Sequence, residues 1–142
     1  MLKSIYFNRC YFVLATVLFL TEVFIALYVR DDFIRPFFGD YLVVILIYAC
    51  VRTFFKIQVW LTCLGVLIFS YLIEALQYYN LVGLLGLQDS VVANVIIGNS
   101  FSWVDIWWYT LGILTVFALE KLLRSAASGR KFCTNRMESD EA

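Results

Sequence analysis

The stretch LIFSYLIEALQYYNLVGLLG, residues 67–86, holds a single carboxylate, Glu74, in a run that is otherwise almost wholly apolar. Residues 58–73 carry no charge at all. A carboxylate in such surroundings is costly both in a soluble core and in a membrane. What Glu74 does therefore depends first on whether this run lies in protein or in lipid.

The composition of the chain indicates lipid. Hydrophobic residues make up 63% of the 142 residues and charged residues 15%, whereas soluble domains have about 45–50% and about 25%. Four long runs carry few or no charges, which is typical of membrane-spanning helices, and no period-two alternation suggests a membrane barrel. We predict an all-α membrane protein, a bundle of four transmembrane helices. The predicted spans are about residues 11–28, 41–55, 59–78 and 103–119.

The distribution of lysine and arginine predicts the orientation of these spans. Both residue types occur before the first span, between the second and third, and after the fourth, whereas residues 79–102 hold neither. The positive-inside rule then puts both termini in the cytoplasm. We expect residues 1–124 to form one transmembrane domain. Residues 125–142 lose the apolar character, and we expect a mobile cytoplasmic tail.

The four cysteines are scattered without ligand spacing, and the chain has no histidine. This argues against zinc sites and against catalysis by histidine, so we expect no metal and no cofactor. An enzyme would depend on aspartate and glutamate alone as acid and base. The sequence therefore favours a protein that is not an enzyme, and we expect no nucleic-acid partner.

Three carboxylates, Glu22, Glu74 and Asp105, fall in the outer half of the predicted spans, and we find none in the inner half. An acid within a membrane is tolerated when it is paired, protonated or facing water. Residues three or four positions apart share a helix face, so each acid belongs to a partly polar stripe. We predict that these stripes surround an outward-facing pocket. The candidate ligand-binding residues are Glu74, Gln77, Asp105, Arg35, Glu22, Asp32, Arg30 and Ser102.

Several of these residues also have a purely structural interpretation. Ser102 and Asp105 have the spacing of a capping box, so Asp105 could simply begin the fourth helix. Asp40 could be the N-cap of the second helix. Glu22 and Glu74 could be neutral hydrogen-bonding groups that join helices. The sequence leaves these alternatives open.

Two segments of the chain resemble a known group of proteins. Residues 73–87, IEALQYYNLVGLLGL, and 96–112, IIGNSFSWVDIWWYTLG, resemble the Glu-x-x-Gln … Asp … Gly pattern of VanZ-like membrane proteins. Residues 26–48 resemble more closely one branch, a bacterial domain-of-unknown-function family of small four-helix proteins. By this resemblance, the residues of the VanZ-like motif correspond to Glu74, Gln77, Asp105 and Gly112. The residues of the branch motif correspond to Asp32, Arg35, Pro36 and Asp40. VanZ-like chains often carry an arginine between the Gln and the Asp, and residues 88–104 have none.

The resemblance implies a multi-pass protein of the bacterial cytoplasmic (inner) membrane and cell envelope, whose activity is unknown. Our leading hypothesis is that the outer pocket binds the polar or anionic head group of an envelope lipid or lipid-linked precursor, with Arg30 and Arg35 meeting a phosphate. One alternative is a small proton-coupled transporter or flippase, although the inner half lacks a matching acid. The other is a structural partner of a larger membrane complex. The ligand, the oligomeric state and any protein partner are not predicted.

Overall fold

The structure is a computed structural model that describes residues 7–30, 34–92 and 101–140, without the side chains of 34–36, 81 and 129–140. Its elements are α1 (Arg9–Tyr28), α2 (Ile34–Phe54), α3 (Val59–Tyr78), α4 (Leu81–Leu84) and α6 (Trp103–Asp140). Four segments are long and apolar enough to span a membrane: Arg9–Tyr28, Phe37–Phe54, Val59–Tyr78 and Trp103–Ser128. The predicted all-α fold with four membrane-spanning helices is confirmed.

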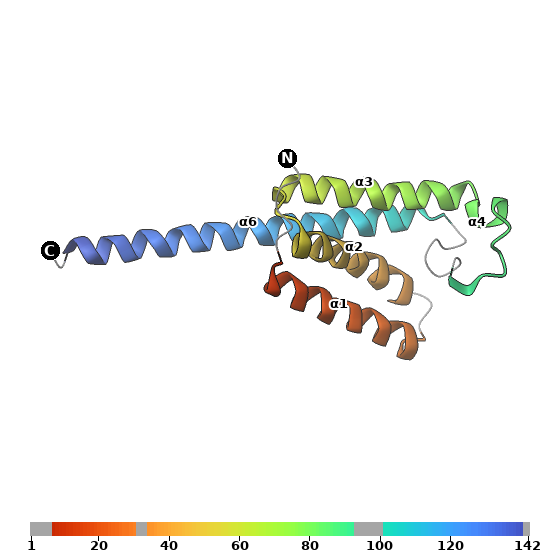
Figure 1. Cartoon of the computed structure of the whole chain (residues 1–142), viewed down its shortest axis with the longest axis horizontal. Coiled ribbons are helices and arrows are strands. Elements are labelled where there is room, and N and C mark those ends of the chain that lie inside the picture. Colours follow the sequence, from red (N-terminus) through yellow and green to blue (C-terminus); the bar gives the residue numbers. More distant parts are fainter. Residues whose placement is uncertain (1–6, 31–33, 93–100, 141–142) are drawn as a thin grey trace.

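The four long helices run alternately in opposite directions (Figure 1). Helices α2, α3 and α6 pack against one another, whereas α1 packs on α2. We call one end of the bundle the α4 end; there α1 and α3 finish and α6 begins. The other is the 55–58 end, where residues 55–58 join α2 to α3. Beyond this second end α6 continues as a single projecting helix (Figure 1).

The core lies among α2, α3 and α6. Its buried members are Val44, Tyr48, Val59, Cys63, Val66, Tyr109, Ile113 and Val116. Helix α1 contributes a single buried residue, Ala15, and turns its large apolar side chains outward. Lipid is as apolar as these side chains, so their exposure carries no penalty in a membrane. The buried polar side chains of α2, α3 and α6 therefore lie at the interface of these three helices.

Gly112 sets the closest approach of α2 and α6. A Cβ atom on this residue would lie 2.4 Å from Val44 Cγ2 and 2.8 Å from the backbone oxygen of Tyr41. Only a residue without a side chain allows the two backbones to come so near. Because of this close contact, the polar side chains of α2 and α6 that lie on either side of Gly112 along the helices face one another.

Two boundaries differ from those predicted. Helix α2 begins at Ile34 and not at Tyr41, so Asp40 lies well inside the helix and is not its N-cap. Pro36 fits because the first turn of a helix has no partner for a backbone N–H. Helix α6 continues to Asp140, well beyond the predicted end of the fourth span at residue 119. That residues 125–142 form a mobile cytoplasmic tail stays a prediction.

Candidate functional site

Three acidic side chains from three helices meet around one tyrosine at the α4 end. The Tyr109 hydroxyl of α6 lies 3.1 Å from Glu74 Oε1 of α3 and 3.3 Å from Asp40 Oδ1 of α2. The carboxyl group of Asp105, one turn before Tyr109, interacts electrostatically with those of Asp40 and Glu74. We call Asp40, Glu74, Asp105 and Tyr109 the carboxyl cluster.

Glu74 also supports the start of α6. Its Oε2 accepts a hydrogen bond from the backbone N–H of Ser102 at 3.4 Å, and the Ser102 hydroxyl accepts one from the N–H of Val104 at 3.3 Å. In a capping box the backbone N–H of Ser102 would bond to the side chain of Asp105. Here Glu74 takes that place, so the side chain of Asp105 is available to contact Asp40.

The hydrogen bonds of this cluster require shared protons. The Tyr109 hydroxyl has one proton and lies within hydrogen-bonding distance of two carboxyl groups. It bonds fully to both only when one of these carboxyl groups carries a proton of its own. The charged groups that act on Asp40 and Glu74 are other carboxyl groups; among the described residues no lysine or arginine does so. Among the described side chains, the cluster is therefore rich in acceptors and has no positive partner.

The structure brings some of the predicted site residues together and separates others. Glu74, Asp105 and Ser102 lie in or next to the carboxyl cluster. Gln77, one turn beyond Glu74 on α3, is half-buried and engaged in a contact. Glu22 is on α1 and faces Gly39 of α2, next to Asp40, but no interaction between Glu22 and a member of the cluster is described. Asp40, which the sequence suggested as a helix cap, occupies the position expected for Glu22.

Among the described residues, no ion pair involves Glu22, Arg30 or Arg35. Glu22 Oε2 lies 3.7 Å from where a Cβ of Gly39 would stand, and its Oε1 is buried without a hydrogen-bond partner among the described residues. Arg30 is exposed just after the end of α1. Arg35 belongs to the first turn of α2, but its side chain lies outside the described residues, as does Asp32 altogether.

A second polar cluster, which the sequence did not predict, lies toward the 55–58 end. Glu120 of α6 accepts hydrogen bonds from the hydroxyls of Tyr48, at 3.0 Å, and Tyr11. The Arg52 guanidinium stands 5.2 Å from the centroid of the Tyr11 ring and interacts electrostatically with Glu120. We call these four residues the Glu120 cluster. Acids that bond between helices therefore occur toward both ends of the bundle, and the expectation that they gather at one end only is wrong.

The spacing of α6 could have revealed Glu120. The buried residues Tyr109, Ile113 and Val116 recur at helical spacing, and Glu120 follows four positions after Val116. It therefore continues the face that packs on α2. The fourth span was predicted to end at residue 119, one position before Glu120.

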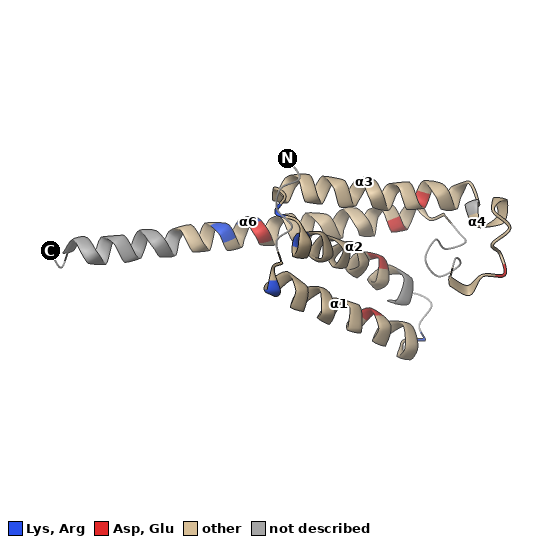
Figure 2. Cartoon of the chain, in the orientation of Figure 1, with Lys and Arg blue, Asp and Glu red and all other residues tan. Residues whose placement is uncertain are grey.

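Between the two clusters the interface of α2 and α6 is mostly apolar. It contains the Gly112–Val44 contact and one hydrogen bond, from the Tyr41 hydroxyl to Thr115 Oγ1 at 3.1 Å. Asp105 and Glu120 are 15 residues apart, or about 22 Å along a helix. Figure 2 shows acidic stretches of α1, α2, α3 and α6 toward the α4 end and most of the described lysine and arginine toward the other.

Metal binding is not favoured by this geometry. In the described parts of the chain, no group of three or more His, Cys, Asp or Glu side chains could hold a metal ion. The carboxyl cluster is built from hydrogen bonds, with Tyr109 as its centre. Such an arrangement can hold protons or accept hydrogen bonds from a ligand.

Comparison with known proteins gives a family but no activity. No solved structure matches the chain. A family model described as a protein of unknown function, DUF2809, matches residues 29–113. The matched range includes the whole carboxyl cluster and excludes Glu22 and Glu120. The wider resemblance to VanZ-like proteins stays a prediction. Because the match extends over more than half of the sequence, this four-helix membrane protein belongs to the DUF2809 family of proteins of unknown function.

Proposed function

We propose that the protein binds, at the α4 end, the polar head group of an envelope lipid or lipid-linked precursor. One observation carries this proposal: carboxyl groups from α2, α3 and α6 converge on Tyr109 without a described positive charge. Such a group of acceptors suits a ligand that donates several hydrogen bonds, such as the hydroxyls of a sugar or of glycerol. An uncompensated acid within a membrane is costly, and such residues usually mark functional sites.

The members of the site have different roles in this proposal. Asp40 and Asp105 are partly exposed and would accept hydrogen bonds from the ligand. Glu74 is only 1% exposed and would act as a positioning residue that holds Tyr109 and the start of α6. Arg30 and Arg35, at the same end of the bundle, would meet a phosphate of the head group with their planar guanidinium groups.

The binding proposal is tested by ligand-dependent stability. A ligand that binds the folded state raises its melting temperature, so we would measure this shift for the purified protein across a panel of glycolipids, phospholipids and lipid-linked precursors. Asp40→Asn and Asp105→Asn should remove the shift given by the best ligand. Asp89→Asn is the matched control, because Asp89 is exposed in the connection between α4 and α6. If both cluster variants keep the wild-type shift, the carboxyl cluster is not the binding site.

The proposal requires the α4 end to face the outside of a bacterial cytoplasmic membrane. The position of the lysines and arginines supports this orientation, because cytoplasmic loops carry an excess of both. Reporter fusions after Gly39 and Ser90 should report an extracytoplasmic location, and fusions after Arg52 and Arg130 a cytoplasmic one. A cytoplasmic result at Ser90 would place the carboxyl cluster on the wrong side of the membrane for an envelope ligand.

A second candidate, proton-coupled transport, is favoured by one specific observation. Glu120 supplies an acid toward the other end of the bundle: it lies on α6, as Asp105 does, and accepts a hydrogen bond from Tyr48 of α2, the helix of Asp40. Proton flux into liposomes that contain the protein would test it. Under this alternative Glu120→Gln abolishes flux, whereas under head-group binding the same variant leaves the ligand-induced shift unchanged.

A further inference from the structure

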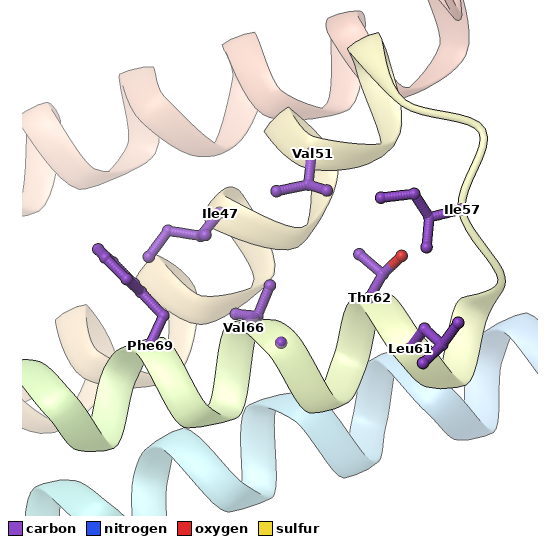
Figure 3. Close-up of a pocket in the computed structure, with 8 residues that line it drawn as sticks. Ile47, Val51, Ile57, Leu61, Thr62, Val66 and Phe69 are labelled. Carbon is purple, nitrogen blue, oxygen red and sulfur yellow. The ribbon is translucent and has the colours of Figure 1, made fainter. Parts of the chain in front are cut away.

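An apolar groove of about 380 Å³ runs between α2 and α3, next to the 55–58 end. Ile47 and Val51 of α2 line one side and Leu61 and Phe69 of α3 the other, and Ile57 stands at its end (Figure 3). The hydroxyl of Thr62, also in the lining, donates to the carbonyl of Gln58 at 3.1 Å. The groove therefore offers a ligand almost no polar partner.

We propose that this groove binds an acyl chain of an anionic phospholipid, whose phosphate contacts Lys56. The first support is length. Leu61 and Phe69 are eight residues apart, which is about 12 Å along a helix. One leaflet contributes roughly 15 Å of hydrocarbon, half of the bilayer core. The groove thus begins at a membrane surface and ends near the middle of the bilayer, as an acyl chain does.

The shape of the groove favours a flexible chain over another helix. Gly65 opens the groove, because nothing lies within 4 Å of where its Cβ would stand. Close packing of a second membrane helix uses small residues at successive turns. Here the positions four residues before and after Gly65 are Leu61 and Phe69, which are both large. They leave a narrow slot in which a single acyl chain fits better than a helix backbone.

The charge around the groove selects an anionic head group. From residue 41 to residue 73 the chain carries two positive charges, Arg52 and Lys56, and no acid. Lys56 is exposed in the connection that closes the groove, and Arg52 donates a hydrogen bond to the carbonyl of Ile57 beside it. The exposed ring of Trp60, a residue typical of the membrane interface, lies at the same level of α3. A phosphate here would meet Lys56 at the depth where lipid head groups lie.

This lipid site is independent of the proposed head-group site. It is at the opposite end of the bundle, it uses other residues, and it requires no particular orientation in the membrane. A phospholipid held here would fill the gap between α2 and α3 and would stabilise their packing by mass action.

The test is a lipid titration of the full chain in detergent micelles, with the melting temperature as the readout. Dioleoylphosphatidylglycerol should raise the melting temperature at lower concentration than dioleoylphosphatidylcholine, and glycerol phosphate alone should give no shift. Gly65→Leu should fill the groove and remove most of the shift from both lipids. Lys56→Gln should weaken the phosphatidylglycerol effect roughly fivefold, the effect of one lysine near a charged membrane surface, and leave phosphatidylcholine unchanged.

Matched controls make the outcome decisive. Leu72→Phe enlarges an exposed residue of α3 beyond the groove, and Lys121→Gln removes an exposed positive charge of α6; both should behave as the wild type. If Gly65→Leu does not fold, Gly65→Val fills the groove with a shorter side chain. A wild-type lipid shift in the folded groove variant would overturn the proposal. A second result would also overturn it: light scattering shows a dimer of the wild type, and Gly65→Leu dissociates this dimer. The groove would then bind a second copy of the protein.

Discussion

The carboxyl cluster and the Glu120 cluster both join α2 to α6, the first with α3 and the second with α1 as a further member, but their charges are balanced differently. In the Glu120 cluster, one acid receives two tyrosine hydroxyls and interacts with Arg52. In the carboxyl cluster, three acids surround one tyrosine, with no described positive charge. The first arrangement satisfies its acid, whereas the second requires shared protons.

This difference indicates which cluster serves the fold and which serves the function. Removing one partner of a satisfied buried group leaves the other uncompensated and is destabilising, so the Glu120 cluster should stabilise the bundle. A group of acids without a cation among the described side chains stabilises little by itself, and its presence within a membrane needs another reason. We therefore favour head-group binding at the carboxyl cluster over a proton path that uses both clusters.

The largest effect should come from separating α2 and α6 between the two clusters. Gly112→Ala puts a Cβ against Val44 and against the backbone oxygen of Tyr41, which cannot move aside. We expect a loss of stability at the upper end of the range of about 1–3 kcal/mol for overpacking. Gly65→Ala is the control, because its Cβ meets nothing within 4 Å, and it should be neutral or slightly stabilising. Equal melting temperatures for the two variants would mean that α2 and α6 do not approach so closely.

The next largest effect should come from the Glu120 cluster. Glu120→Gln keeps one acceptor oxygen but leaves Arg52 without its acid, so we expect a loss of about 1–2 kcal/mol, within the range for removing a partner of buried hydrogen bonds. Arg52→Gln should be destabilising as well. The double variant should lose less than the sum of the two, since a pair in contact is not additive. Strict additivity in unfolding measurements would show that Glu120 and Arg52 do not interact.

Much of the fold could be predicted from the sequence, because lipid makes uncharged runs easy to recognise. The start of α2 could not, since Phe37 and Phe38 fit an interfacial loop as well as a helix, and Pro36 is compatible with both. The length of α6 was also missed. Residues after Ser125 lose their apolar character. Such a composition indicates that a segment lies in water, but it does not show whether the segment is helical, because alanine, lysine and arginine are good helix formers in water.

The candidate site could be predicted only in part. Helical spacing puts Glu74 on one face with Ser70, and Asp105 on one face with Tyr109, and in the structure these residues are buried or half-buried. It could not show which helices are neighbours, because exposed apolar side chains on α1 are no less stable in lipid than buried ones. For that reason Glu22 on α1 was expected where the structure has Asp40 of α2.

Removing an acid from the carboxyl cluster should affect stability far less than Glu120→Gln does. Glu74→Gln can still accept a hydrogen bond from Tyr109 but loses the one from the N–H of Ser102, and it removes one of three crowded acids. We expect the free energy of unfolding to change by less than about 1 kcal/mol, the net contribution of one hydrogen bond, while the ligand-induced shift is reduced. A destabilisation as large as that of Glu120→Gln would indicate that Glu74 has an undescribed positive partner, and the contrast between the clusters would fail.

The smallest effect should come from a hydrogen bond outside both clusters. The Tyr71 hydroxyl of α3 lies 2.6 Å from Thr110 Oγ1 of α6, on the lipid-facing side of the bundle. Interhelical hydrogen bonds in membranes contribute about 0.6 kcal/mol on average, so Tyr71→Phe should lower the free energy of unfolding by about that amount. It should leave ligand-induced stabilisation unchanged.

Tyr109→Phe makes the matching change in the carboxyl cluster, where two carboxyl groups depend on the hydroxyl that is removed. It should therefore abolish the ligand-induced shift that Tyr71→Phe preserves. If the two tyrosine variants are indistinguishable in both measurements, the Tyr109 hydroxyl is an ordinary contact between helices and the carboxyl cluster is not a binding site.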